Sequence, residues 1–183
     1  SLSLSLSLSV YIYIYSSLHT LTCNSACFAR HSVGIVGVGK GAPRARRLTE
    51  LLEVILGPPA DPDKRAHTEN SSAPGQGCRV LVFVLYKKEA MDIGKMLAAR
   101  GFSVVSLQGD MSQSARSRAM QAFRDGDASV LVATDVAARG LDVAEVTHVI
   151  NFSFGLSIEN YVHRVGRCGR AGRKGEAITF FTD

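Results

Sequence analysis

The sequence predicts an α/β fold in which a mostly parallel sheet is covered by helices on both faces. Short apolar segments alternate with segments of helical periodicity from residue 80 to residue 181, and such alternation is typical of parallel strands joined by helical crossovers. The segment VLVFVL at 80–85 is continuously apolar, as expected of a strand buried on both faces. With 183 residues, 46% of them hydrophobic, the chain can form one domain with a substantial core plus tails, or two small domains.

The boundaries of the expected elements follow from periodicity and from capping residues. Gly57 and Pro58 end the first helix, and Gly101 ends the second. Ser112 is a suitable N-cap for the third helix, in which Met120 and Phe123 share one face. Helices are expected at 44–56, 87–100, 112–123 and 158–165, and strands at 80–85, 102–107, 130–133, 146–150 and 177–181.

Residues 1–43 are expected to form an irregular or disordered head before a domain that spans residues 44–183. Residues 1–17 read SLSLSLSLSVYIYIYSS, and such two-residue repeats are low-complexity sequence. We interpret this head as a gene-model artefact. An organelle transit peptide is the alternative, because the head is rich in Ser, contains Arg and has no acidic residue before Glu50.

Two other segments are assigned no site. Residues 34–41, GIVGVGKG, have the spacing of a phosphate-binding P-loop, but Gly41 stands where a Ser or Thr is needed for Mg²⁺. Residues 57–78 are rich in Pro, Ser, Gly and charged residues, which predicts a flexible insertion. No stretch of about 18 unbroken apolar residues exists, so we expect no membrane span.

The net positive charge of the chain comes from residues 1–49. The net charge is +5 and the pI is about 9.2, yet residues 1–49 hold five basic residues and no acidic one. Subtracting these five from the 21 basic residues leaves 16, against 16 acidic residues. Binding to a nucleic acid would therefore depend on local patches. The four cysteines form no CxxC pair, which favours reduced thiols in an intracellular protein.

The segment at 161–175, YVHRVGRCGRAGRKG, is the first candidate site. It contains His163 and four arginines spaced by three, with glycines between them and no acidic residue from 160 to 175. Glycines allow close approach of the backbone, and the guanidinium fork binds phosphate oxygens in pairs. The segment therefore predicts a phosphate-binding loop, and a solvated basic loop is the alternative. The four arginines are Arg164, Arg167, Arg170 and Arg173.

Two further loops follow expected strands. In QGDMSQSAR, Gln113 and Arg116 lie three residues apart at the start of a helix, where N–H groups and an arginine can bind an anion. In ATDVAARGLD, Thr134 follows a buried strand and Asp142 lies beyond a turn. The hydroxyl can donate to phosphate and the carboxylate can accept from ribose. An ordinary capped helix and a surface turn with an Asp N-cap are the alternatives.

Four segments together resemble the second RecA-like domain of DEAD-box RNA helicases. They are LVFVLYKKEA (motif four), QGDMSQSAR (the Q-x-x-R element), ATDVAARGLD (motif five) and YVHRVGRCGRAGR (motif six). The resemblance covers residues 44–183, and the order and spacing of the motifs make it specific. It implies a RecA-like sheet between helices. Within the family, the sequence looks most similar to the branch linked with splicing and ribosome assembly.

The resemblance implies nucleotide-binding and catalytic roles. Arg167 and Arg170 would face the γ-phosphate across a cleft between two domains, with Arg170 as the arginine finger. His163 would couple this site to the RNA site. Asp142 would bind the ribose of the nucleotide, with Gly140 nearby.

The resemblance also implies an RNA site and an interdomain contact. Gly109, Gln113, Arg116 and Thr134 would hold RNA phosphates, and such contacts read the shape and the 2′-hydroxyls of RNA rather than its sequence. Arg139 would bridge the two domains.

Several residues differ from the family pattern. Ser153 and Gly155 replace the Asp and Pro of the N-Y-D-x-P turn, so we expect a looser approach to the motif-six helix. Cys168 replaces Thr between the two key arginines, a substitution that we expect to be tolerated. Leu85 and Tyr86 replace Asn and Thr in motif four, and Gln108 replaces His.

The chain contains no P-loop ending in GKT, no D-E-A-D and no upstream glutamine motif. In the family these belong to the first domain, which would bind most of the ATP and Mg²⁺. We therefore expect this chain to be inactive alone, and to act with RNA, ATP and the first RecA-like domain of the same protein as a monomer. We expect the protein in the nucleus, nucleolus or cytoplasm, with an organelle as an alternative.

Three other functions remain open. The chain could be a stand-alone RNA-binding or scaffold module that has lost catalysis, a related DNA helicase domain, or a fragment without function of its own.

Overall fold

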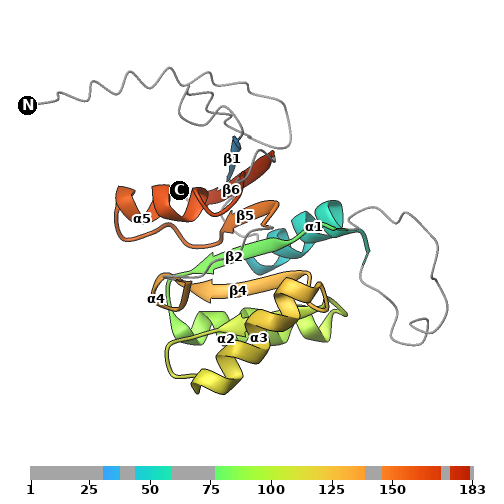
Figure 1. Cartoon of the computed structure of the whole chain (residues 1–183). Coiled ribbons are helices and arrows are strands. Elements are labelled where there is room, and N and C mark those ends of the chain that lie inside the picture. Colours follow the sequence, from blue (N-terminus) through green and yellow to red (C-terminus); the bar gives the residue numbers. More distant parts are fainter. Residues whose placement is uncertain (1–30, 38–43, 59–76, 139–145, 170–173, 182–183) are drawn as a thin grey trace, which may run out of the picture.

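The computed structural model describes residues 31–37, 44–58, 77–138, 146–169 and 174–181, with only the backbone of 31–37 and 181. Six strands form one sheet in the order β1-β6-β5-β2-β4-β3, and all of the strand pairs in it are parallel. The strands are β1 (His31–Gly37), β2 (Val80–Val84), β3 (Val104–Leu107), β4 (Val130–Thr134), β5 (His148–Asn151) and β6 (Gly175–Phe181). The helices are α1 (Arg44–Leu56), α2 (Lys87–Ala99), α3 (Gln113–Asp125), α4 (Asp135–Ala138) and α5 (Ile158–Val165) (Figure 1).

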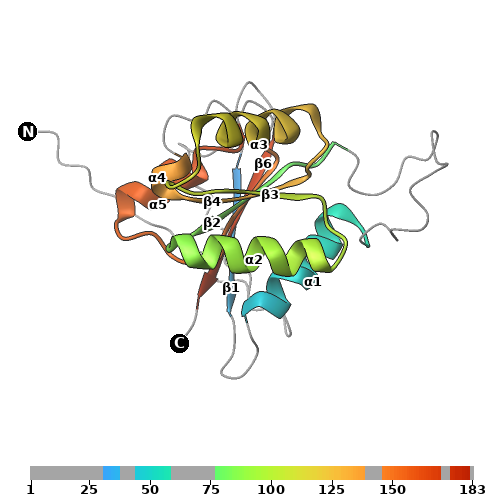
Figure 2. The same ribbon diagram turned by 90° about the horizontal axis from the view of Figure 1, so that it is seen from below.

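Helices cover both faces of the sheet, as the sequence predicts. Figure 2 shows α3, α4 and α5 on one face and α1 and α2 on the other. The side chains of β2 alternate between these faces, so that Val80 and Val82 pack in one core cluster with α1 and α2. Leu81 and Phe83 pack in the second cluster, beneath α3, α4 and α5.

The capping residues act as expected. The Ser112 hydroxyl accepts a hydrogen bond from the Ala115 N–H at 3.3 Å, at the start of α3. Gly101 follows α2 with a φ of 87°, a conformation that favours glycine. Met120 and Phe123 are both buried on the inner face of α3.

Two elements were not expected from the sequence. The strand β1 lies within the predicted irregular head and pairs with β6 from His31 to Gly37. Its segment contains Val and Ile, which suit a strand, and pairing satisfies the open edge of β6. The single turn α4 follows β4 directly. The remaining head, residues 1–30 and 38–43, and most of the predicted insertion, residues 59–76, lie outside the described residues.

The strand order decides which loops meet. Because β5, β2 and β4 are neighbours and run parallel, their carboxyl ends lie at one edge of the sheet. The segments that follow them are residues 152–157, Leu85–Tyr86 and α4. This is the edge at which ligands bind in open α/β sheets.

His148 is the first residue of β5, so it lies at the opposite end of the strands, and it is half-buried there. Its Nε2 lies 3.8 Å from Glu176 Oε2, and its Nδ1 lies 2.8 Å from the Thr147 hydroxyl. Burial lowers the pKa of His148 below its ordinary value of 6.5, partly opposed by Glu176. The unfolded chain therefore binds a proton at His148 more readily than the folded chain does. For this reason the free energy of unfolding should fall as the pH decreases below about 7.

We expect His148→Gln to reduce this pH dependence. Urea unfolding at pH 7.5 and 5.5 should show a smaller loss of stability on acidification for the variant than for the unchanged chain. His163→Gln, at an exposed position, is the control. An equal loss in all three proteins would show that the burial of His148 does not contribute.

Candidate functional site

Helix α5 carries the first residues of the candidate phosphate-binding segment at 161–175. Its bounds, Ile158–Val165, agree with the prediction, and the Ser157 hydroxyl caps it by accepting from the Asn160 N–H at 3.2 Å. The pKa of Glu159, in the first turn, is lowered by its own backbone N–H and by the Ser157 hydroxyl. The helix ends at Gly166, and Gly169 in the following turn has a φ of 68°.

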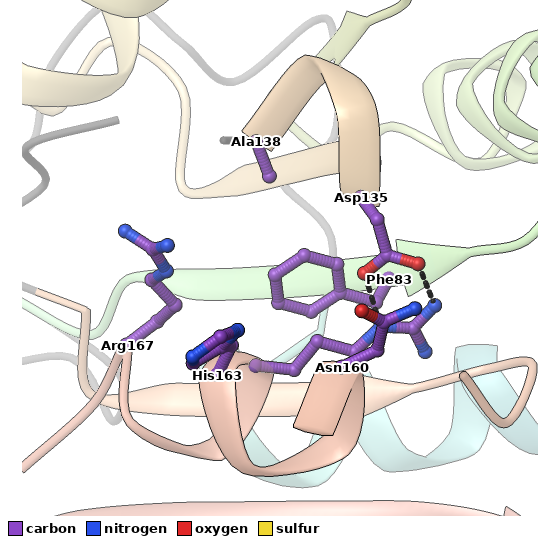
Figure 3. A pocket seen from close by; sticks show the side chains of 7 residues that line it. Phe83, Asp135, Ala138, Asn160, His163 and Arg167 are labelled. Atoms are coloured by element: carbon purple, nitrogen blue, oxygen red, sulfur yellow. Dashed lines mark hydrogen bonds and ion pairs between the residues drawn. The ribbon is translucent and has the colours of Figure 1, made fainter. Parts of the chain in front are cut away.

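Arg164 is a buried charge in the middle of this region. It is 1% exposed, and its Nε and Nη2 donate to the two carboxylate oxygens of Asp135 at 2.6 and 2.7 Å (Figure 3). Its Nη1 donates to the Ser153 carbonyl at 2.6 Å. The guanidinium also lies 5.0 Å from the centre of the Phe83 ring, a cation–π geometry.

The buried ion pair corrects one inference from the sequence. From the sequence, we predicted that all four arginines of the segment 161–175 lack a carboxylate partner and suit phosphate. This prediction is wrong for Arg164, which binds Asp135. The acidic partner is 29 positions away in the chain, on α4, and reaches Arg164 only because β4 and β5 flank β2.

Arg167 and His163 line a small pocket beside this ion pair. Asn160, His163 and Arg164 on α5 are spaced i, i+3 and i+4, which places them on one face of the helix, and Arg167 follows in the turn after it. In Figure 3 the side chains of His163 and Arg167 lie on the far side of the pocket from the Asp135 carboxylate. The other lining residues are Phe83, Asp135 and Ala138.

The size of the pocket limits what it can bind alone. Its volume is about 60 Å³, whereas pockets that enclose small ligands have on the order of 300–1,000 Å³. The cationic Arg167 can contact an anionic group at its mouth. A nucleotide would need further walls from another surface.

Two arginines from different helices bind α4. Arg164 binds Asp135 at its first residue, and Arg116 Nη2 on α3 donates to the Ala137 carbonyl at 2.7 Å. The Thr134 hydroxyl accepts from the Ala137 N–H at 3.5 Å. α4 therefore links the segment proposed for phosphate on α5 to the segment proposed for RNA on α3.

The structure places four of the predicted RNA-contacting residues near the same edge. Gln113 is exposed at the start of α3, whereas Arg116 is half-buried and Thr134 is 5% exposed. Gly109 is exposed, and a Cβ there would lie 3.6 Å from Lys87 Cε. Lys87 Nζ in turn binds Asp110 Oδ1 at 2.6 Å. Whether these residues bind RNA stays a prediction.

Five residues of the predicted sites lie outside the described residues. They are Arg139, Gly140, Asp142, Arg170 and Arg173. His163 and Arg167 are described, and both line the pocket.

Gly175 allows the turn after α5 to lie against β6. A Cβ on Gly175 would overlap the backbone nitrogen of Gly169 and lie 2.8 Å from Cys168 Cβ. Cys168 is fully buried here, and its Sγ donates to the Val165 carbonyl. Neither Cys78 nor Cys168 forms a disulfide.

The sequence predicted no site role for Glu89 and Ser153, nor for the pocket residues Phe83, Asp135, Ala138 and Asn160. The Glu89 carboxylate accepts from the Leu85 N–H at 3.0 Å and from the Ser153 hydroxyl. An acidic residue in the first turn of a helix is a general signal for such a contact, but the partner at 153 is not. Ser153, which we expected to loosen the approach to α5, is instead 8% exposed and hydrogen-bonded.

Residues 64–172 match the family described as the helicase conserved C-terminal domain. The chain belongs to this family. It is 47% identical over 154 residues to the ATP-dependent RNA helicase dbp3 of Emericella nidulans, covering 83% of this chain and 31% of that protein. The chain thus spans about a third of the length of such curated relatives.

Solved structures agree with this assignment. The E. coli DEAD-box protein SrmB superposes with a TM-score of 0.61 at 34% identity, covering 76% of this chain and 70% of that one. The RNA helicase Prp28 of Chaetomium thermophilum, bound to ADP, gives 0.62 at 38% identity, covering 81% and 32%. The resemblance and the RecA-like fold inferred from the motifs are confirmed: the chain is a C-terminal helicase domain of the DEAD-box type.

Two features are absent from the described part of the chain. None of its helices has the length and apolar character to cross a membrane. Within the same residues, no three His, Cys, Asp or Glu side chains are grouped to hold a metal ion.

The buried ion pair predicts a large difference between two Asp→Asn substitutions. Asp135→Asn removes the charge opposite the buried Arg164 and should lower the free energy of unfolding by about 3 kcal/mol. Asp110→Asn breaks the exposed pair with Lys87, in which the side chains are 55% and 76% exposed, and should cost less than about 1 kcal/mol. Urea unfolding of both variants measures this. Equal losses would contradict the structural role of the buried pair.

Proposed function

We propose that the chain is the second RecA-like domain of an ATP-dependent RNA helicase. The observation that carries the proposal is the pocket at α5, where a buried ion pair fixes the helix that presents His163 and Arg167. The small volume of the pocket suits one half of a site that a second domain completes. The relatives named ATP-dependent RNA helicases support this function.

In the proposed mechanism, this domain supplies cations to the nucleotide rather than the main binding site. The first domain of the same protein would hold most of the ATP and the Mg²⁺. The ATP would supply the phosphoryl group, and the Mg²⁺ would neutralise part of its charge. Arg167 and Arg170 would stabilise the charge of the transition state, with Arg170 as the finger. Asp142 would bind the ribose beside Gly140.

The RNA would bind at the same edge of the sheet. Gly109, Gln113, Arg116 and Thr134 would contact its phosphates, and Arg139 would bridge the two domains. The contact of Arg116 with the Ala137 carbonyl and the contact of Arg164 with Asp135 connect the RNA side to the nucleotide side through α4. His163 would take part in this coupling. The enzyme would act as an intracellular monomer, in the nucleus, nucleolus or cytoplasm.

The first test compares this chain with the complete protein. Phosphate release from ATP should be stimulated by RNA in the complete protein and should be undetectable for the purified chain alone, because the residues proposed to bind ATP and Mg²⁺ are in the first domain. Hydrolysis by the chain alone would contradict the division of roles. RNA binding without hydrolysis by the complete protein would instead favour a non-catalytic RNA-binding module, and stimulation by DNA a DNA helicase.

The second test concerns the arginine finger. In the complete protein, Arg170→Ala should reduce the turnover number by roughly 10³- to 10⁵-fold, with ATP binding largely unchanged. The binding of a fluorescent ATP analogue and steady-state hydrolysis would be measured in parallel. Arg46→Ala on α1, where Arg46 binds the exposed Glu50, is the matched control. Hydrolysis that survives in Arg170→Ala would contradict the assignment of the finger.

A further inference from the structure

We propose that Glu89 and Ser153 are a pair of positioning residues that aims Arg164 and thereby fixes α5 for catalysis. The pair lies outside the motif-six segment, and neither of its residues lines the pocket. Its catalytic consequence rests on the proposed function above, whereas its effect on α5 does not.

The contact between the two side chains is partly buried, with Ser153 as its buried member. The Ser153 hydroxyl lies 3.0 Å from both carboxylate oxygens of Glu89, and Ser153 is 8% exposed. A second donor, the Leu85 N–H, lies 3.0 Å from Glu89 Oε2. The carboxylate is therefore held between the start of α2 and the segment after β5.

Ser153 transmits this contact to Arg164 through its own backbone. Its carbonyl accepts from Arg164 Nη1 at 2.6 Å, while its N–H points to the Phe83 carbonyl at 3.4 Å. The hydroxyl and the carbonyl of one residue thus bind Glu89 and Arg164 at the same time. Removal of the hydroxyl would free residue 153 to turn its carbonyl away from the guanidinium.

The position of Arg164 matters because its neighbours on α5 line the pocket. Arg164 lies next to His163 and three residues before Arg167, and all three contribute to the pocket wall. A guanidinium held by Asp135 on one side and by the Ser153 carbonyl on the other fixes both the rotation and the axial position of α5. Without the hydrogen bond to the Ser153 carbonyl, Arg164 would keep its contacts with Asp135 and the longer 3.4 Å hydrogen bond from its Nη1 to Asn151 Oδ1.

The charge at position 153 is constrained by Glu89. A carboxylate in place of the hydroxyl would face the half-buried carboxylate of Glu89 at short range, and like charges at such a distance repel. Serine supplies a neutral donor there. This explains why Ser153 suits this chain, although the family motif has Asp at that position.

The first measurement is amide hydrogen exchange of α5 in this chain. Ser153→Ala should raise the exchange rates of the amides at 162–167 by about tenfold, because it removes a hydrogen bond to a charged group. Ser153→Thr keeps a hydroxyl and should retain the original rates. Ser117→Ala, at an exposed position on α3, is the control. Unchanged rates in Ser153→Ala, or equal rates in the Ala and Thr variants, would overturn the proposal.

The second measurement reverses the charges in the complete protein. Ser153→Asp should lower the turnover number by more than Ser153→Ala, and the double variant Glu89→Lys with Ser153→Asp should recover activity above both of its single variants, because an ion pair replaces the repulsion. Losses that simply add in the double variant would show that the two residues do not act as a pair.

The kinetic signature separates positioning from general damage. The turnover number should fall roughly three- to tenfold in Ser153→Ala, while the KM for ATP stays within about twofold, because arginines that act in the transition state contribute little to ground-state binding. A rise in KM with an unchanged turnover number would overturn this role. If the unmodified complete protein hydrolyses no ATP, the proposed function fails, and the exchange rates still decide the positioning pair.

Discussion

The buried guanidinium of Arg164 constrains the arrangement of the whole site. Transfer of a charge from water to a protein interior costs several kcal/mol unless it is paired and hydrogen-bonded. Here Asp135 and the Ser153 carbonyl provide those partners, and Phe83 provides the ring beneath. Asp135 lies on α4, Ser153 lies in the segment after β5, and Phe83 lies on β2. These three elements must therefore meet at one point, and Arg164 holds α5 there.

The order of the strands makes this meeting possible. β2 lies between β5 and β4, so the segments that leave their carboxyl ends converge although they are far apart in the sequence. α4 receives Arg164 from α5 and Arg116 from α3. The nucleotide side and the RNA side of the proposed site are thus joined by one helical turn. Arg164 binds its Asp135 side chain, and Arg116 binds its Ala137 carbonyl.

The fold could be predicted largely from the sequence. Continuous apolar segments such as 80–84 and periodic segments such as 44–56 give strands and helices by local rules, and Ser112 and Gly101 give their ends. β1 could not be predicted in this way, because a short Val- and Ile-containing segment becomes a strand only when an open edge such as that of β6 accepts it. The single turn α4 depends likewise on its contacts with Arg164 and Arg116.

The α/β class, the family and the helix at 158–165 that carries His163 follow from the sequence, because periodicity and motif spacing are local properties of the chain. Only the tertiary structure decided which arginine is structural. The partner of Arg164 is 29 residues away and that of Ser153 is 64 residues away. A charged side chain looks the same in a sequence whether it faces solvent, a phosphate or a buried carboxylate; its burial and its partner exist only after the strands are ordered.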